Sequence, residues 1–470
     1  MSNDLHRADS STAVIATATI PPTRGRILRW ASWDWGSAAF NAVTTTFVYT
    51  VWLTSAAFIG DHTLVDQRNA DKAAGLASSP AIDEVEAILA QHSSWLGLGL
   101  SLAGMVVALL APVIGHRSDE SGNRRRNLGI TTFGTVICMI AMWFVQPDPD
   151  WLFFGIALIA VGNVFFELAS AEYNALLPGV SSPKDVGRVS GMGWGMGYIG
   201  GIVLLAIVLV GFINPTVGWF GVGDEHGTRY RAVALLAALW FAVFALPTLL
   251  QRDGLPEPAR ASAARRTSFF GVYRELGRTI ARLWRSARST LVFLIASAIY
   301  RDGLAGVFTF GGVLAAGTFG FSSSEVIVFA IAANVVSGIA TMLLGMIEDR
   351  VGPRVLITIS LIGMIVAALL TLLTSGGGKA FFWIFGMLMC VFVGPVQSAS
   401  RSFLTSITPV GHHGEIFGLY ATTGRAVSFL APAAFSVSVA LLGAQIWGIL
   451  GIAAVLLVGL VLFTRVRVAR

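Results

Sequence analysis

The amino-acid sequence predicts an all-α integral membrane protein with about twelve transmembrane helices in two six-helix bundles. Hydrophobic residues make up 55% of the 470 residues and charged residues only 12%, about half the charged fraction of a soluble domain. Apolar runs long enough to cross a bilayer as helices recur from Trp30 to the C-terminus. These runs lack the period-2 alternation of a membrane β-barrel. A loop motif that occurs once in each half of the chain indicates the two bundles.

Twelve segments are expected to span the membrane, which puts both termini on one side. The expected spans are 30–58, 93–114, 127–146, 151–177, 189–213, 231–250, 290–317, 325–346, 355–374, 381–404, 415–442 and 445–464. Lys and Arg gather in the cytoplasmic loops of membrane proteins. With a cytoplasmic N-terminus, 24 basic residues lie on the cytoplasmic side, five lie opposite and three fall within spans. The sequence therefore predicts an N-in/C-in topology.

The chain divides into four expected regions. They are a disordered cytoplasmic tail (1–29), an N-terminal bundle (30–250), a cytoplasmic linker (251–289) and a C-terminal bundle (290–470). The tail lacks the apolar core and cleavage site of a signal peptide. In the linker, apolar residues and arginines occupy different faces of a predicted helix over 268–288. We expect this helix to lie on the anionic cytoplasmic surface, with partner binding as the alternative.

The segment 59–92 is external, long and acidic. A solvated loop is the simpler expectation for it, and a partly ordered lid is the alternative. The net charge of +6 follows from the cytoplasmic loops and does not indicate nucleic-acid binding. Arg far outnumbers Lys, and Gly and Ala are abundant, as in bacteria with GC-rich genomes. We therefore expect a multi-pass protein of the bacterial cytoplasmic membrane.

An internal repeat follows the second and eighth spans. GHRSDESGNRRR ends at Arg126, and GMIEDRVGPR ends at Arg354. Both copies have the order Gly, Asp, Gly, Arg at the same spacing; the matching positions are Gly115, Asp119, Gly122 and Arg124, then Gly345, Asp349, Gly352 and Arg354, with Arg350 beside Asp349 in the second copy. Gly permits a tight turn, Asp can cap the next helix, and Arg can hold the end of a neighbouring helix. Such contacts would lock one conformation and release it in another.

The repeated loop resembles the signature G-x-x-x-D-[RK]-x-G-[RK]-[RK] of the major facilitator superfamily, which implies the twelve-helix fold of that superfamily. In the second copy only Pro353 departs from the pattern. In the first copy Glu120 and Asn123 stand where basic residues are expected. The two loops are therefore not expected to make equivalent contacts.

Four longer stretches resemble one branch of that superfamily, the autophagy-related vacuolar effluxer-like proteins. They are WASWDWGSAAFNAV, FFELASAEYNALLP, RDGLAGVFTFGGVLAAGTFGFSSSEV and GPVQSASRSFLTSITPVGHHGEIFGLYATTGRAVSFLAP. Eukaryotic members return amino acids from the vacuole to the cytosol, so the resemblance implies amino acids or similar small metabolites as solutes. Asp34 and Arg401 match the recurrent pattern of the family.

The sequence predicts no enzymatic chemistry, no cofactor and no metal site. A GxxxxGK[ST] phosphate loop, an HExxH motif and a Ser/His/Asp grouping are all absent. The two cysteines, Cys138 and Cys390, lie inside apolar runs and are interpreted as core residues. The expected energy source is therefore a gradient of protons or of another coupling ion.

Charges within spans are the candidates for coupling and solute binding, because a charge at bilayer depth costs about 2.5–3.5 kcal/mol unless it is paired or hydrated. Asp34 is either an interfacial charge or helix-start cap, or a protonatable or gating group. Glu167 has no adjacent base, which favours a neutral carboxyl suited to proton coupling. Glu172, nearer the cytoplasm, is expected to pair with a base.

The basic candidates carry alternatives of their own. Arg301 and Asp302, followed by Gly303, indicate either a broken helix that lines a cavity or a bridge between helices. Arg401 would bind a carboxylate or lock against Glu172. Arg425, deeper in its span, is the better candidate for a substrate carboxylate.

Two aromatic residues in the fifth span complete the candidate set. Trp194 and Tyr198 lie beside glycines at four-residue spacing, which predicts close helix packing. These side chains either pack or face the solute.

The sequence as a whole predicts a monomeric secondary active transporter that moves a small polar solute by alternating access. The lipid bilayer, the solute and a coupling ion are its expected partners. Two alternatives are an exporter of drugs or other hydrophobic compounds, and a membrane sensor or scaffold without transport.

Overall fold

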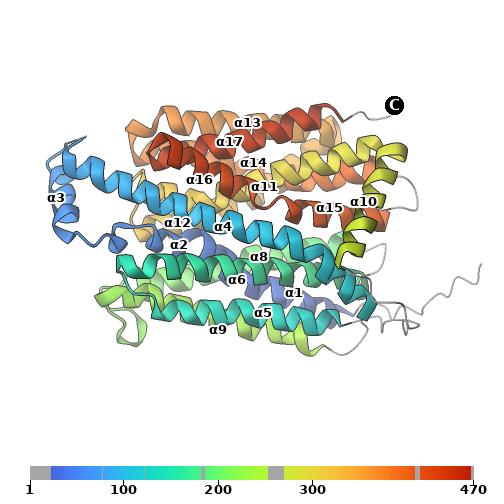
Figure 1. Ribbon diagram of the computed structural model, residues 1–470, viewed down its shortest axis with the longest axis horizontal. Helices are drawn as coiled ribbons and strands as arrows, with labels where there is room; N and C mark the ends of the chain where they lie inside the picture. Colours follow the sequence, from blue (N-terminus) through green and yellow to red (C-terminus); the bar gives the residue numbers. More distant parts are fainter. Residues whose placement is uncertain are drawn as a thin grey trace, which may run out of the picture.

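The computed structural model describes residues 23–76, 78–121, 123–181, 186–251, 269–407 and 413–466. All regular secondary structure in these ranges is helical. Figure 1 shows long helices that run side by side along the longest axis of the molecule. Eleven of the described helices are long and apolar enough to cross a membrane.

The N-terminal half contains five helices of spanning length and one interrupted span. Its elements are α1 (Arg24–Ala38), η1 (Ala39–Phe47), α2 (Tyr49–Leu53), α3 (His62–Ala73), α4 (Pro80–Ser121), α5 (Arg124–Ala141), α6 (Pro149–Ala175), α7 (Leu177–Val180), α8 (Val186–Val208) and α9 (Thr228–Leu250). The interrupted span is the first one expected, in which the π-helix η1 separates α1 from α2. Together with the eleven longer helices it makes up the twelve-span fold.

The C-terminal half repeats this plan. Its elements are α11 (Arg288–Gly317), α12 (Ser323–Val351), α13 (Pro353–Leu373), α14 (Lys379–Ile407), α15 (His413–Ala426), α16 (Leu430–Leu442) and α17 (Gly448–Thr464), and α10 (Phe269–Ser286) precedes them. α10 lies within the linker where an amphipathic helix is expected. The Tyr273 hydroxyl of α10 donates to the Leu109 carbonyl of α4, so α10 contacts the N-terminal half. Residues 252–268 of the linker lie outside the described ranges.

The first helix begins earlier than the sequence indicates. α1 starts at Arg24, and the Thr23 side chain accepts a hydrogen bond from the Arg26 amide. The Arg26 guanidinium also donates to the Gly179 carbonyl at 2.5 Å. The expectation of a disordered tail is therefore wrong for residues 24–29, because a cap and a tertiary contact order them. Residues 1–22 lie outside the described ranges.

The external segment is ordered, so the expectation of a solvated loop is wrong. Most of it forms α3 and the first turns of α4. Ile59, Val85 and Leu89 make a small apolar core there, and Lys72 pairs with Glu86 at 3.0 Å. These contacts stabilise a projection at the end of the molecule opposite α10 (Figure 1).

The eleventh expected span, 415–442, is broken into two helices. Helix α11, which belongs to the seventh span, is continuous across Arg301–Gly303. α15 ends at Ala426 and α16 begins at Leu430. A Cβ atom on Gly104 of α4 would lie 2.8 Å from the Phe429 amide nitrogen. Only glycine therefore lets α4 approach the backbone at this break. The sequence left open a broken helix at Arg301 or a bridge between helices; the break lies in a neighbouring helix, and Arg301 and Asp302 contact its two parts.

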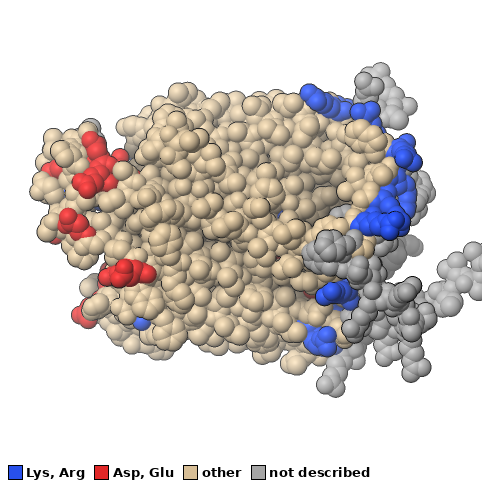
Figure 2. Space-filling model, viewed as in Figure 1, with Lys and Arg blue, Asp and Glu red and all other residues tan. Residues whose placement is uncertain are grey.

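The charges divide between the two ends of the bundle. Figure 2 shows acidic side chains at the end that carries α3 and basic side chains at the end that carries α10. Basic residues mark the cytoplasmic side of membrane proteins. The α10 end is accordingly the cytoplasmic end, and α3 lies at the external end.

Candidate functional site

Hydrogen bonds join the two halves at the external end. Ser94 of α4 and Ser436 of α16 lie 3.1 Å apart between hydroxyl oxygens. The hydroxyl oxygens of Tyr230 and Ser323 lie 2.7 Å apart, and Gln445 donates to the Ser93 hydroxyl at 2.5 Å. The candidate charges lie deeper, on the cytoplasmic side of these contacts.

Asp34 lies in the middle of α1, so it does not cap the start of a helix. The Tyr173 hydroxyl of α6 donates to its Oδ2 atom at 3.1 Å. The rings of Trp30 and Trp33 stack on Tyr173 with centroids 4.6 and 4.4 Å away. A Cβ atom on Gly193 of α8 would lie 2.9 Å from Asp34 Oδ2. Within the described residues, this carboxyl is held by a phenol and aromatic walls, with no salt bridge.

Glu167 and Arg425 form an ion pair across the two halves. Arg425 Nε lies 3.2 Å from Glu167 Oε2, and its Nη2 atom donates to the Ser170 hydroxyl at 2.8 Å. The expectation that Glu167 has no base beside it is therefore wrong, whereas solute binding by Arg425 stays a prediction. Glu167 has a base beside it, contributed by the other half of the chain, and the Arg425 guanidinium is engaged by protein groups.

The Glu167–Arg425 pair should show strong energetic coupling. Glu167→Gln or Arg425→Gln leaves a partly buried charge without its partner, and we expect each to destabilise the protein by about 1.5–3 kcal/mol, the range for hydrogen bonds to charged groups. The exchange Glu167→Arg with Arg425→Glu should recover part of this loss. Thermal unfolding of the purified variants measures both effects. Additive losses in the exchanged variant would contradict the pairing.

Glu172 belongs to a network inside the N-terminal half. It is 1% exposed, and Arg124 Nη1 lies 3.8 Å from its Oε2 atom. The Ser118 hydroxyl donates to the same carboxylate, and Asn127 donates to Ser118 Oγ at 2.6 Å. The expected base is therefore Arg124, and the alternative lock between Arg401 and Glu172 is not formed.

The two repeated loops hold helix ends in similar ways. Arg125 Nε donates to the Leu249 carbonyl in the last turn of α9 at 3.0 Å. Arg354 donates to the Thr464 carbonyl at the end of α17 at 3.3 Å. The sequence alignment of the loops pairs Arg354 with Arg124, but the structure gives the equivalent contact to Arg125.

Other residues of these loops are less fully described. Gly352 joins α12 to α13 with a φ of 81°, a conformation that favours glycine. Arg350 is exposed, and a Cβ atom at Gly115 or Gly345 would meet no neighbour. Gly122 and the side chains of Asp119 and Asp349 lie outside what the structure describes.

Arg301 and Asp302 hold the two ends of the broken eleventh span. Arg301 Nη1 donates to the Tyr420 carbonyl of α15 at 3.0 Å, and its guanidinium lies 4.1 Å from the Tyr420 ring centroid. Asp302 Oδ2 accepts from the Ala431 amide in the first turn of α16 at 2.6 Å. Arg301 thus contacts the middle of α15, and Asp302 meets the N-terminus of α16, where the helix dipole favours an anion. We call this pair the clasp.

Arg401 faces an aromatic wall across the halves. Its guanidinium carbon lies 5.5 Å from the ring centroid of Trp194, and Trp194 lies 6.3 Å from Tyr198. Trp194 is 44% exposed, so its ring is not enclosed by packing. Arg301 and Tyr420 lie within electrostatic range of Arg401. The C-terminal half therefore presents the Arg401 guanidinium to an aromatic residue of α8.

Sequence reasoning missed several partners of these charges. Tyr173 occurs in the FFELASAEYNALLP stretch, but nothing in the sequence shows that its hydroxyl meets Asp34. Ser118, Ser170 and the Ala431 amide carry no sequence signal, because they act through tertiary contacts. In the described part of the chain, no group of three His, Cys, Asp or Glu residues is placed to hold a metal.

Comparisons with known proteins agree with this fold. The family model described as "Vacuole effluxer Atg22 like" matches residues 22–470. An uncharacterized MFS-type transporter of Bacillus subtilis, YxiO, is 23% identical over 437 residues, which cover 92% of both chains. Autophagy-related protein 22 of Cryptococcus neoformans is 23% identical over 301 residues, 60% of this chain and 53% of that protein.

Solved transporters share the architecture at low sequence identity. A D-xylose-proton symporter superposes with a TM-score of 0.60 at 15% identity, and covers 92% of this chain and 95% of its own. The nucleoside transporter NupG superposes with a TM-score of 0.56 at 14% identity, over 95% of this chain and 100% of its own. These likenesses concern the fold. With the family match over nearly the whole length, they show that the chain is a membrane transporter of the major facilitator superfamily and belongs to its Atg22-like family.

Proposed function

We propose that the protein is a proton-coupled secondary transporter of a small polar solute, an amino acid or a similar metabolite. The observation that carries this proposal is the state of Asp34. Its carboxyl contacts a tyrosine hydroxyl and has no salt bridge among the described residues. Because a charge at bilayer depth is costly when it is unpaired, such a carboxyl is suited to gain and lose a proton during a transport cycle.

The C-terminal half supplies the groups that would bind the solute. Arg401 faces the partly exposed ring of Trp194 across the two halves. A guanidinium can bind a carboxylate through two parallel hydrogen bonds. We assign carboxylate binding to Arg401, because it faces a partly exposed aromatic ring of the other half. Arg425 contacts Glu167 and Ser170 in this conformation.

Flux into liposomes tests the proposal. The purified chain is reconstituted, and uptake of radiolabelled L-amino acids and small carboxylic acids is measured with and without an imposed pH gradient. We expect the gradient to drive accumulation of at least one of these solutes. If every accepted solute moves at the same rate with and without the gradient, proton coupling is wrong. If none moves while a hydrophobic dye does, the solute class is wrong.

Replacing Arg401 should weaken solute binding more than it weakens the fold. We expect Arg401→Gln to raise KM for a carboxylate solute by roughly tenfold or more, because a hydrogen bond to a charged group contributes about 1.5–3 kcal/mol. Arg465→Gln, at an exposed position, is the matched control and should leave KM unchanged. Equal KM values for Arg401→Gln and the unmodified chain would remove Arg401 from the binding site.

We also propose that the protein is a monomer of the bacterial cytoplasmic membrane. The relative from Bacillus subtilis matches 92% of its own length, whereas the match to the fungal relative spans about half of that protein. The match to the bacterial relative thus extends over nearly its whole length, which supports a bacterial location. The Arg-rich composition supports the same location.

A further inference from the structure

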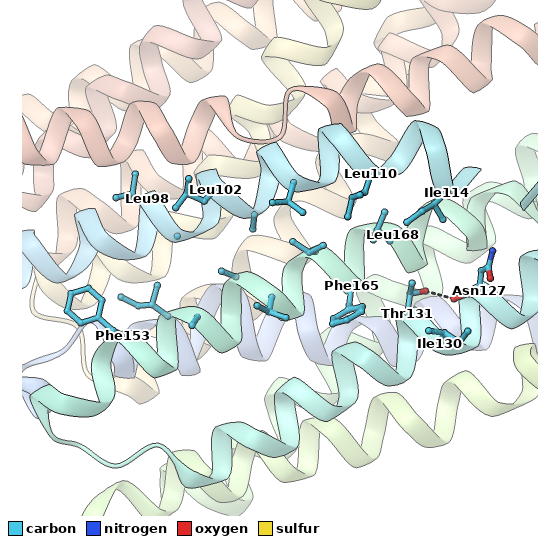
Figure 3. A pocket seen from close by; sticks show the side chains of 18 of the residues that line it. Leu98, Leu102, Leu110, Ile114, Asn127, Ile130, Thr131, Phe153, Phe165 and Leu168 are labelled. Carbon is cyan, nitrogen blue, oxygen red and sulfur yellow. Dashed lines mark hydrogen bonds between the residues drawn. The ribbon is translucent and has the colours of Figure 1, made fainter. Parts of the chain in front are cut away.

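A long groove runs over the N-terminal half, on a face separate from the clasp and from Arg401. It lies between α4, α5 and α6 and has a volume of about 900 Å³. Figure 3 shows side chains of α4 and α6 that face each other across it, among them Leu102, Leu110, Phe153 and Phe165. Leu98, Leu102 and Phe153 are 51%, 55% and 59% exposed. In a bilayer these side chains face the hydrocarbon rather than water.

The groove is as long as the hydrocarbon core is thick. On α4 its lining extends from Trp95 to Arg117, which is roughly 33 Å at the helical rise of 1.5 Å per residue. A bilayer core is about 30 Å thick. The shape therefore fits an extended acyl chain better than a compact solute.

The polar groups of the groove lie at one end. Arg117 is the only charged side chain among the described residues that line it, and Asn127 and Thr131 lie near it. The Thr131 hydroxyl already donates to the Asn127 carbonyl at 2.8 Å, as the dashed line in Figure 3 marks. Arg117 is exposed and lies at the cytoplasmic end of α4. An occupant must accordingly be apolar along its length and anionic at its cytoplasmic end.

The neighbouring helix α10 adds positive charge at the same end. Its Tyr273 hydroxyl donates to the Leu109 carbonyl, one residue before the groove-lining Leu110. The side chains of Arg274, Arg278 and Arg282 on α10 are exposed. Clusters of Lys and Arg on the cytoplasmic side of a membrane attract anionic headgroups.

We propose that this groove binds an anionic phospholipid of the cytoplasmic leaflet, with one acyl chain between α4 and α6 and the phosphate at Arg117. The headgroup then lies one residue from Ser118, which donates to Glu172 and accepts from Asn127. The lipid therefore adjoins the network that joins α4, α5 and α6 at their cytoplasmic ends. This inference does not depend on the solute or on the coupling ion.

Native mass spectrometry of the full-length protein tests the site. The protein is titrated with phosphatidylglycerol and with phosphatidylcholine of identical acyl chains. We expect tighter binding of phosphatidylglycerol, and Arg117→Gln should reduce that preference by about fivefold, since one Lys or Arg near the surface contributes about a factor of this size. Arg126→Gln, which removes an exposed arginine outside the groove lining, is the matched control and should keep the preference.

A second pair of variants tests the acyl-chain position. Ala157 lines the groove and is exposed, so Ala157→Phe should fill it and reduce tight binding of both lipids. Ala454→Phe changes an exposed alanine of α17 and should have no effect. Equal affinity for the two lipids in the unmodified chain, or a preference that survives Arg117→Gln, would overturn the proposal. The proposal would also be overturned if glycerol phosphate alone displaced the lipid and Ala157→Phe left lipid binding unchanged. The site would then bind a headgroup without an acyl chain.

Discussion

Asp302→Ala is expected to destabilise the protein and to abolish transport. The Ala431 amide of α16 donates to Asp302, and the residue that precedes α16, Phe429, provides no side-chain cap. Asp302 thus acts as a cap supplied by another helix. Removal of this acceptor leaves a buried N–H group unsatisfied, which costs about 1–3 kcal/mol. Thermal unfolding and liposome flux, measured on the same preparation, check the two effects.

Asp302→Asn provides the matched comparison, because the amide oxygen can still accept from Ala431. We expect Asn to keep most of the stability that Ala loses, while the loss of the negative charge weakens the interaction with the α16 dipole by about 0.3–1 kcal/mol. The clasp predicts this order, with the native residue most stable and Ala least. If Asp302→Ala and Asp302→Asn were equally stable, the hydrogen bond to α16 would not contribute to the free energy of unfolding.

Asp34→Asn is expected to remove the part of the flux that a pH gradient drives. Asn has nearly the shape of a protonated Asp and can still accept from the Tyr173 hydroxyl, so the fold should be retained. A carrier fixed in this state can exchange solute across the membrane, but it cannot release a proton. We therefore expect gradient-driven accumulation at the level of protein-free liposomes, with exchange of preloaded solute preserved.

Tyr173→Phe is the companion variant for Asp34. It removes the hydrogen bond that the described residues give the Asp34 side chain and keeps the ring that Trp30 and Trp33 stack on. Gradient-driven flux should persist with a shifted dependence on pH. Undiminished accumulation by Asp34→Asn would show that another acid carries the proton.

Much of the fold follows from the sequence, because bilayer thickness dictates the length of each apolar run. Residues 381–404 and 355–374, for example, lie close to the ends of α14 and α13. The interruptions could not be predicted in the same way. The π-helix after Ala38 and the break before Leu430 both lie inside expected spans, and partners from other helices contact the break. Gly104 and Asp302 are such partners, and each is remote in sequence from the break that it contacts.

The candidate site could be predicted as a set of residues but not as a set of pairs. Charges inside spans are rare, so Asp34, Arg301 and Arg401 are recognisable without a structure. Pairing depends on which helices of the two halves meet, and the contact between Arg425 and Glu167 is an example. Adjacent residues such as Arg301 and Asp302 point in different directions, which is evident from sequence. That they point to the two ends of one broken helix is a property of the tertiary structure.

The clasp also determines how the membrane potential can act on this protein. Moving one elementary charge through the full potential involves about 2.3 kcal/mol per 100 mV. Arg301 and Asp302 are neighbours on one helix and sum to zero, as do Glu167 and Arg425 across the halves. When such pairs move as units, they do almost no electrical work. The voltage dependence of transport would therefore come from the charges of the solute and of the proton that moves with it, and not from the charges that hold the eleventh span together.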